Sequence, residues 1–103
     1  MSWAIANEIR GCGGKPEVRA TKEADVSVRI GEKRICFEVE TGDNIHSYGP
    51  EHVREKMAAI RRNCDKLIVL VTKRELRGKY ANLSGAETIT RTEVQEAVRL
   101  LFK

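Results

Sequence analysis

The stretch Ile35-Cys36-Phe37-Glu38-Val39-Glu40-Thr41-Gly42 organises the rest of this chain. Its odd-numbered residues as far as Val39 are apolar, which is the alternation of a β-strand with one face in the core. Successive side chains of a strand point to opposite faces, so Glu38 and Glu40 share the other face. Gly42 ends the strand, because glycine marks the point where a loop begins. Two carboxylates on one short strand are typical either of a solvated face or of a metal site.

Composition limits the class of protein. The chain has 103 residues, of which 41% are hydrophobic, and this predicts one globular domain over 1–103. No apolar run reaches membrane-spanning length, and the N-terminus lacks the layout of a signal peptide. Cys12, Cys36 and Cys64 have no paired spacing, so we expect free thiols in a reducing cytoplasm and neither a disulfide nor a zinc framework. The net charge of +4 permits a polyanionic partner.

Periodicity predicts alternating helices and strands. Helices are expected over 2–12, 51–63 and from 90 onward, and strands over 17–22, 24–30, 35–42, 66–72 and 86–89. In the first helix, Trp3 is expected to anchor the start against the core. The strand over 66–72 is apolar on both faces and is therefore expected to be central, and parallel to the strand before it. The segment 42–50 is expected to be a polar loop, and Thr90 to Glu93 has the pattern of a capping box.

The two strands before the loop form a hairpin that gathers acids on one face. Apolar residues are even-numbered in the first strand and odd-numbered in the second. To bury both sets on one face, the hairpin must pair residues whose numbers add up to an odd value. Pairing Ile30 with Ile35 across a turn at 31–34 places Asp25 opposite Glu40. Glu38 lies on the same face, so three carboxylates converge there.

Three neighbouring carboxylates repel one another unless a cation neutralises them. Oxygen ligands of this kind suit Mg²⁺ or Mn²⁺. The alternative interpretation is a solvated sheet face, with Arg29 and other basic side chains as partners of the acids.

The order of elements resembles the core of the PD-(D/E)XK nuclease superfamily, the restriction-endonuclease-like fold. In that family an Asp early in the second core strand is followed, across a hairpin, by Glu-x-Lys on the third. Asp25 matches the first acid and Glu38 matches the second. The resemblance covers about residues 3 to 72. It implies an α/β fold with an α-β-β-β-α-β core, in which a mixed central sheet is flanked by helices.

One position departs from the family pattern, since Glu40 replaces the motif lysine. Some members with such a change carry a lysine on the following helix, and Lys56 flanks the apolar stripe of that helix. The alternative for Lys56 is a surface lysine. Glu8 matches the acid that many relatives carry on the first helix. The run Glu-Val-Glu-Thr-Gly looks most like variants attached to HerA-like DNA-translocating ATPases, which implies an ATPase or helicase partner in the same or a neighbouring chain.

The resemblance implies Mg²⁺- or Mn²⁺-dependent hydrolysis of phosphodiester bonds in DNA. Asp25 and Glu38 would hold the metal, with Glu40 and Glu8 as further ligands, and Glu40 would otherwise orient the attacking water. Lys56 would add positive charge near the scissile phosphate. The residues expected to bind the DNA backbone lie in the loop after the acidic strand and in the segment after the buried strand: Asn44, His46, Tyr48, Lys73, Arg74, Arg77 and Lys79.

Two other functions stay open from the sequence. The replacement at Glu40 favours a catalytically silent member of the same fold, which would bind nucleic acid or dock to a partner ATPase. An unrelated small α/β binding domain with a solvated acidic face is the third interpretation.

Overall fold

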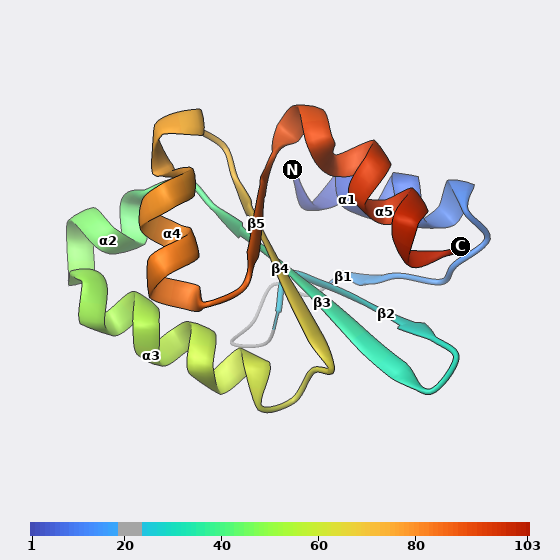
Figure 1. Ribbon diagram of the computed structural model, residues 1–103, viewed down its shortest axis with the longest axis horizontal. Coiled ribbons are helices and arrows are strands. Elements are labelled where there is room, and N and C mark those ends of the chain that lie inside the picture. The colour runs from blue at the N-terminus through green and yellow to red at the C-terminus, as the bar shows by residue number, and fades with distance from the viewer. Residues whose placement is uncertain (19–23) are drawn as a thin grey trace.

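The computed structural model describes residues 1–18 and 24–103, and these form three layers (Figure 1). One face of the sheet is covered by α1 (Ser2–Gly11) and α5 (Val94–Leu101), and the other by α2 (Asp43–Tyr48), α3 (Pro50–Arg61) and α4 (Arg77–Ser84). The strands are β1 (Glu17–Val18), β2 (Val26–Ile30), β3 (Lys33–Glu40), β4 (Lys66–Val71) and β5 (Glu87–Thr90). Short 3₁₀ turns, η1 (Arg74–Leu76) and η2 (Arg91–Glu93), precede α4 and α5.

The sheet has five strands in the order β1-β2-β3-β4-β5. The first three pair antiparallel, whereas β3, β4 and β5 pair parallel. The expected α/β fold with a mixed sheet flanked by helices is confirmed, as is the interior position of β4. The first predicted strand is described only as Glu17–Val18, and its remainder lies outside the described residues. No helix in the described parts of the chain is long and apolar enough to cross a membrane.

The hairpin of β2 and β3 keeps the predicted parity but differs in register by two residues. Ile30 pairs with Lys33, so the predicted pairing of Ile30 with Ile35 is wrong. The turn contains only Gly31 and Glu32, and Gly31 takes a φ of 65°, the left-handed conformation that suits glycine in a tight hairpin. A shift of two residues leaves every side chain on its predicted face but changes which residues are neighbours.

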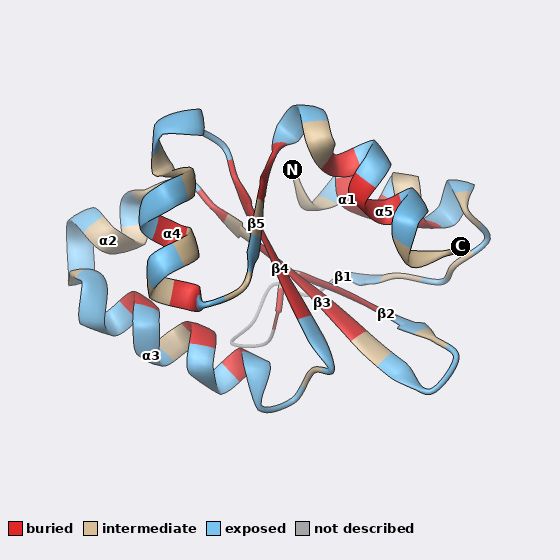
Figure 2. Cartoon of the chain, in the orientation of Figure 1, coloured by how far each residue is buried: buried red, intermediate tan, exposed pale blue. Residues whose placement is uncertain are grey.

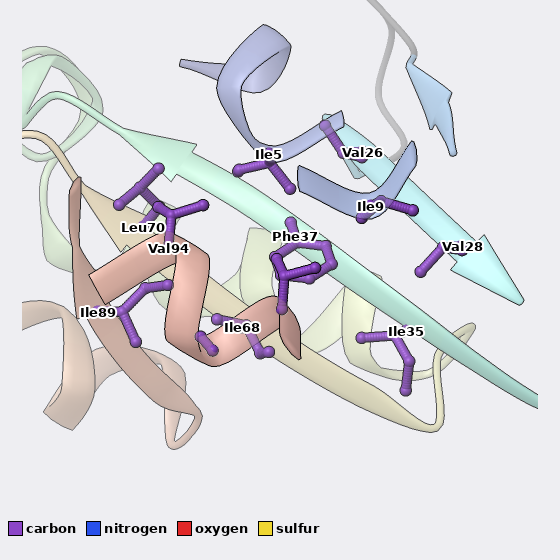
Figure 3. Packing of buried hydrophobic residues seen from close by; sticks show 12 residues of the cluster. Ile5, Ile9, Val26, Val28, Ile35, Phe37, Ile68, Leu70, Ile89 and Val94 are labelled. Carbon is purple, nitrogen blue, oxygen red and sulfur yellow. The ribbon is translucent and has the colours of Figure 1, made fainter. Parts of the chain in front are cut away.

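The face under α1 and α5 carries the larger apolar core, which we call the first core. Figure 3 shows Phe37 of β3 among side chains from α1, α5 and the neighbouring strands. Phe37 is fully buried, and burial of such a ring stabilises the fold by about 2–3 kcal/mol. Trp3 does not join this core, since 74% of it is exposed, and the expectation for Trp3 is wrong. Helix α1 buries Ile5 and Ile9, and the step of roughly 100° per residue puts Trp3 on the opposite side.

The other face carries the second core, between the sheet and α3 and α4. Buried residues line the inner side of both helices and run along β3 and β4 (Figure 2). Helix α3 buries Val53, Met57 and Ile60, as the helical stripe predicts. The expected loop over 42–50 is wrong in part, because it contains the short helix α2. The expected capping box is confirmed, with Thr90 and Glu93 bonded reciprocally at the start of η2.

The cysteines differ from their prediction. Cys36 on β3 forms a disulfide with Cys64, which follows α3, and Cys12 alone is free. The expectation of three free thiols is therefore wrong. Spacing along the chain does not reveal this pair, because 28 residues separate two cysteines that the strand–helix–strand connection brings together. Cys36 is fully buried in the second core, so the bond ties the end of α3 to the strand that carries the acids.

We expect one reactive thiol per chain in denaturant without reductant and three after reduction, measured with a thiol reagent. Cys64→Ala should lower the free energy of unfolding by about 3–4 kcal/mol, because it opens a loop whose closure restricts the unfolded chain. Cys12→Ala is the matched control and should change little under non-reducing conditions. Three reactive thiols in the unreduced protein would contradict the disulfide.

Candidate functional site

The site forms where β3 approaches its C-terminal end, on the face covered by α2, α3 and α4. Glu38 and Glu40 point to this face, and they are only 2% and 1% exposed. The interpretation of a solvated acidic face is therefore wrong for these two side chains. Helices α3 and α4 pack over the strand and remove the glutamates from water. A buried carboxylate is stable only when paired or protonated, so each needs a partner.

Glu40 receives a donor from each of the three helices on this face. Its Oε1 lies 3.1 Å from Nζ of Lys56 on α3. Its Oε2 accepts hydrogen bonds from Nδ2 of Asn44 on α2 at 3.0 Å and from the hydroxyl of Tyr80 on α4 at 3.3 Å. Burial first, and then the charge of Glu40, raises the pKa of Tyr80, so the phenol keeps its proton and donates. Both oxygens of Glu40 thus have partners.

Lys56 links the two glutamates. Its Nζ is 3.5 Å from Oε1 of Glu38 as well as 3.1 Å from Oε1 of Glu40. Burial by itself lowers the pKa of this ammonium group, but the two carboxylates outweigh burial and raise the pKa above its ordinary value of 10.5. The side chain is 30% exposed, so Lys56 is a cation that contacts both the buried acids and solvent.

Glu38 and Asp25 are neighbours at the open end of the hairpin. The register of the strands brings Asp25 beside Glu38, and not opposite Glu40 as predicted. Oδ2 of Asp25 accepts a hydrogen bond of 2.8 Å from the backbone N–H of Val39, which fixes its orientation. Oε2 of Glu38 is buried and receives no hydrogen bond within the described residues. Burial, and then the hydrogen bond to Asp25, raise the pKa of Glu38 to about 9 although Lys56 opposes the shift.

The charges of this cluster are unbalanced. If Asp25, Glu38 and Glu40 were all ionised, the single ammonium group of Lys56 would leave a net charge of about −2 in a largely buried place. A proton on Glu38 removes one of these negative charges, and the protonated carboxyl donates a hydrogen bond to Asp25. A divalent cation would relieve all of it, and the unpaired Oε2 of Glu38 is an oxygen that such a cation would take. The Asp25–Glu38 pair therefore fits Mg²⁺, which is often held by one or two carboxylates and keeps several waters.

The predicted metal ligands do not all gather at this pair. Glu8 lies on α1, against the other face of the sheet, and within the described chain no hydrogen bond or ion pair joins it to the acids. The residues that the structure describes contain no group of three or more His, Cys, Asp or Glu arranged to hold a metal ion. Any metal would accordingly rely on Asp25, Glu38 and oxygens from water, backbone or a bound phosphate.

The residues expected to bind DNA fall into two groups. His46 and Tyr48 are exposed on α2, as are Lys73, Arg74 and Lys79 around η1 and α4. Arg77 is instead half-buried and forms an ion pair with Glu93 of the capping box. Asn44 is also turned inward, to Glu40.

Sequence reasoning missed Tyr80 as a member of the site. Tyr80 is fully buried, and its hydroxyl donates a hydrogen bond to Oε2 of Glu40. Its signal is weak, because 40 residues separate it from Glu40 and a tyrosine on a short helix is usually a packing residue. Asn44 was predicted as a functional residue, but for contact with DNA and not with Glu40.

Comparison of the chain with protein-family models, with curated proteins and with solved structures finds no significant match.

The buried carboxyl of Glu38 predicts the pH dependence of stability. In the unfolded chain Glu38 loses its proton near pH 4.5, whereas in the folded protein it keeps it to about pH 9. Between these values the unfolded state binds fewer protons, so the free energy of unfolding falls as the pH rises. Glu38→Gln cannot lose a proton and should flatten this decline, measured by denaturant unfolding from pH 5 to 9 in the presence of a metal chelator.

Glu55→Gln, on the exposed side of α3, is the matched control and should keep the wild-type slope. Parallel pH profiles of wild type and Glu38→Gln would mean that Glu38 is ionised at neutral pH.

Proposed function

We propose that this chain is a Mg²⁺-dependent nuclease-like domain that hydrolyses phosphodiester bonds in DNA. The observation that carries the proposal is the Asp25–Glu38 pair, which has an unpaired buried oxygen and has Lys56 beside it. The sequence resemblance to the PD-(D/E)XK superfamily adds support, because Asp25 and Glu38 are the two positions that match its acids. The α/β fold with a mixed sheet agrees with that resemblance.

The chemistry is divided among the residues of the cluster. Asp25 and Glu38 would hold Mg²⁺, which, when bound, lowers the pKa of a water molecule and stabilises charge on the phosphate. Asp25 is already oriented for this by the backbone of Val39. Lys56 is a fixed cation whose exposed part is available to a phosphate oxygen. Hydrolysis adds the elements of water across one P–O bond: the water oxygen bonds to phosphorus, and the released sugar oxygen takes up a proton.

The DNA backbone would be bound by exposed residues on the helices that cover the site. Lys73, Arg74 and Lys79 are free to contact phosphates, whereas Arg77 is committed to Glu93. His46 and Tyr48 on α2 are exposed close in sequence to Asn44, which reaches the cluster. We further propose that the chain works with an ATPase or helicase, in the same or a neighbouring chain, in the cytoplasm. The disulfide does not exclude that location, since intracellular proteins of hyperthermophiles are rich in disulfides.

A catalytically silent module that binds nucleic acid or docks to an ATPase is the second candidate. The observation that favours it is the closure of the cluster, since Glu40 is fully partnered and Glu38 holds a proton up to about pH 9. In that case the acids and Lys56 are an internal polar network and the exposed basic residues carry the function.

Incubation of the full chain with Mg²⁺ and single-stranded, double-stranded or branched DNA should give cleavage. Asp25→Asn, Glu38→Gln and Lys56→Ala should each reduce the rate on the order of 10²-fold or more, because each removes a charge from the reacting phosphate or its metal. Glu55→Gln is the control that should keep full activity.

Equal residual cleavage by wild type and the three variants would indicate a contaminant and would remove the nuclease proposal. Salt-dependent DNA binding without any cleavage would favour the silent module.

Neutralising Lys73, Arg74 and Lys79 together should weaken DNA binding and lower the slope of log affinity against log salt. The loss expected for three phosphate contacts is about 2–3 in that slope. Arg77→Gln should instead lower the free energy of unfolding, because it breaks the pair with Glu93, and should leave the slope almost unchanged. A fluorescence titration at several salt concentrations measures both, and an unchanged slope in the triple variant would place the DNA surface elsewhere.

A further inference from the structure

We infer that Glu40 is an internal anchor that positions Lys56, and that Tyr80 and Asn44 are positioning residues that hold Glu40 in this role and away from the metal. The inference rests on the proposed function for its catalytic meaning. It departs from the expectation that Glu40 is itself a metal ligand or the orienter of the attacking water.

The oxygens of Glu40 are already occupied. An ionised carboxylate offers about four lone-pair sites. Oε1 faces Lys56 at 3.1 Å and Asn44 at 3.5 Å, and Oε2 faces Asn44 at 3.0 Å and Tyr80 at 3.3 Å. With Glu40 only 1% exposed, a cation would have to displace one of these donors in order to bind it.

Glu38 is the opposite case on the same strand face. Its Oε1 has Lys56 at 3.5 Å, and its Oε2 has no donor within the described residues. The two glutamates lie two residues apart and are equally buried, yet only one has an oxygen to offer. A cation added to this cluster therefore binds Glu38 and Asp25, and Glu40 stays with its three donors.

The donors to Glu40 also set the position of Lys56. Lys56 is held between the two glutamates, and its shorter contact is to Glu40. If Glu40 turned away, Lys56 would keep only the longer contact to Glu38, and its long side chain would gain access to solvent. Tyr80 and Asn44 do not touch Lys56 in the described contacts, so they act on it through Glu40.

The hydroxyl of Tyr80 makes it possible to distinguish a positioning role of this residue from a packing role. Tyr80 is fully buried, and its ring fills the second core whether or not the hydroxyl is present. Tyr80→Phe keeps the ring and removes one donor to Glu40. A packing role predicts no specific effect on Lys56 in the folded protein, whereas a positioning role does.

The test is the acylation rate of Lys56 in the folded full chain, without metal or DNA. Limiting acetic anhydride at constant pH and peptide mapping give the rate for Lys56 relative to the exposed Lys73. We expect Tyr80→Phe and Asn44→Ala to raise the relative rate several-fold, up to about tenfold, because each removes a hydrogen bond to a charged group. Glu40→Gln should raise it at least as much.

Two substitutions are matched controls for this measurement. Tyr48→Phe removes a hydroxyl from an exposed tyrosine, and Asn82→Ala removes an amide from the exposed side of α4, so neither should change the rate. An unchanged relative rate in Tyr80→Phe, Asn44→Ala and Glu40→Gln would overturn the inference.

A second measurement separates anchor from ligand by Mn²⁺ titration. Glu38→Gln should weaken Mn²⁺ binding at least about tenfold, whereas Glu40→Gln should change it by no more than about threefold. Equal losses in the two variants would make Glu40 a ligand and overturn its assignment as an anchor. If wild type binds no Mn²⁺ and cleaves no DNA, the proposed function fails, and the acylation rates still decide the positioning of Lys56.

Discussion

Burial of two glutamates beneath α3 and α4 is the constraint on which the arrangement of this domain depends. A carboxylate removed from water costs several kcal/mol unless charges and hydrogen bonds replace its hydration. The chain meets this cost unequally. Glu40 has one donor from each of α2, α3 and α4. The packing of these three helices on the sheet therefore also supplies the polar contacts that replace the hydration of Glu40. Oε2 of Glu38 has no donor within the described residues, so Glu38 must either keep a proton or bind a cation.

This unequal treatment gives the two acids different energetic roles. Removing one partner of Glu40 leaves a buried carboxyl group without one of its contacts. The resulting loss in the free energy of unfolding is usually larger than the net stabilisation that the contact provided. Replacing Glu38 with a group that cannot ionise removes the cost of keeping a proton on a buried acid whose ordinary pKa is 4.5. Functional sites often contain a residue that lowers the free energy of unfolding at neutral pH, because the shifted pKa that its function needs is unfavourable for stability.

Alternation and parity were sufficient to predict the hairpin and the shared face of the acids, because backbone pleating determines them locally. The parallel strand β4 followed from its apolar character on both faces and from the helix that connects it to β3. The two-residue register shift was not predictable, since the turn at Gly31 accepts either length and both keep the parity. Burial of the acids was not predictable either, because Glu38 and Glu40 show the same alternation on a wet face as on one covered by helices. Tyr80 and the Cys36–Cys64 bond depend on contacts between distant segments, which no local pattern encodes.

The disulfide has a consequence for how the domain comes apart. The loop that it closes, from Cys36 to Cys64, contains both buried glutamates, Asn44 and Lys56. A single peptide-bond cut anywhere inside that loop leaves two pieces that remain covalently joined. A protease that nicks the connection between α2 and α3, where Tyr48 and Pro50 are exposed, would therefore release neither piece, and the nicked chain could keep its strands and helices in register. Breakage of the backbone and loss of the site are thus separate events in this domain.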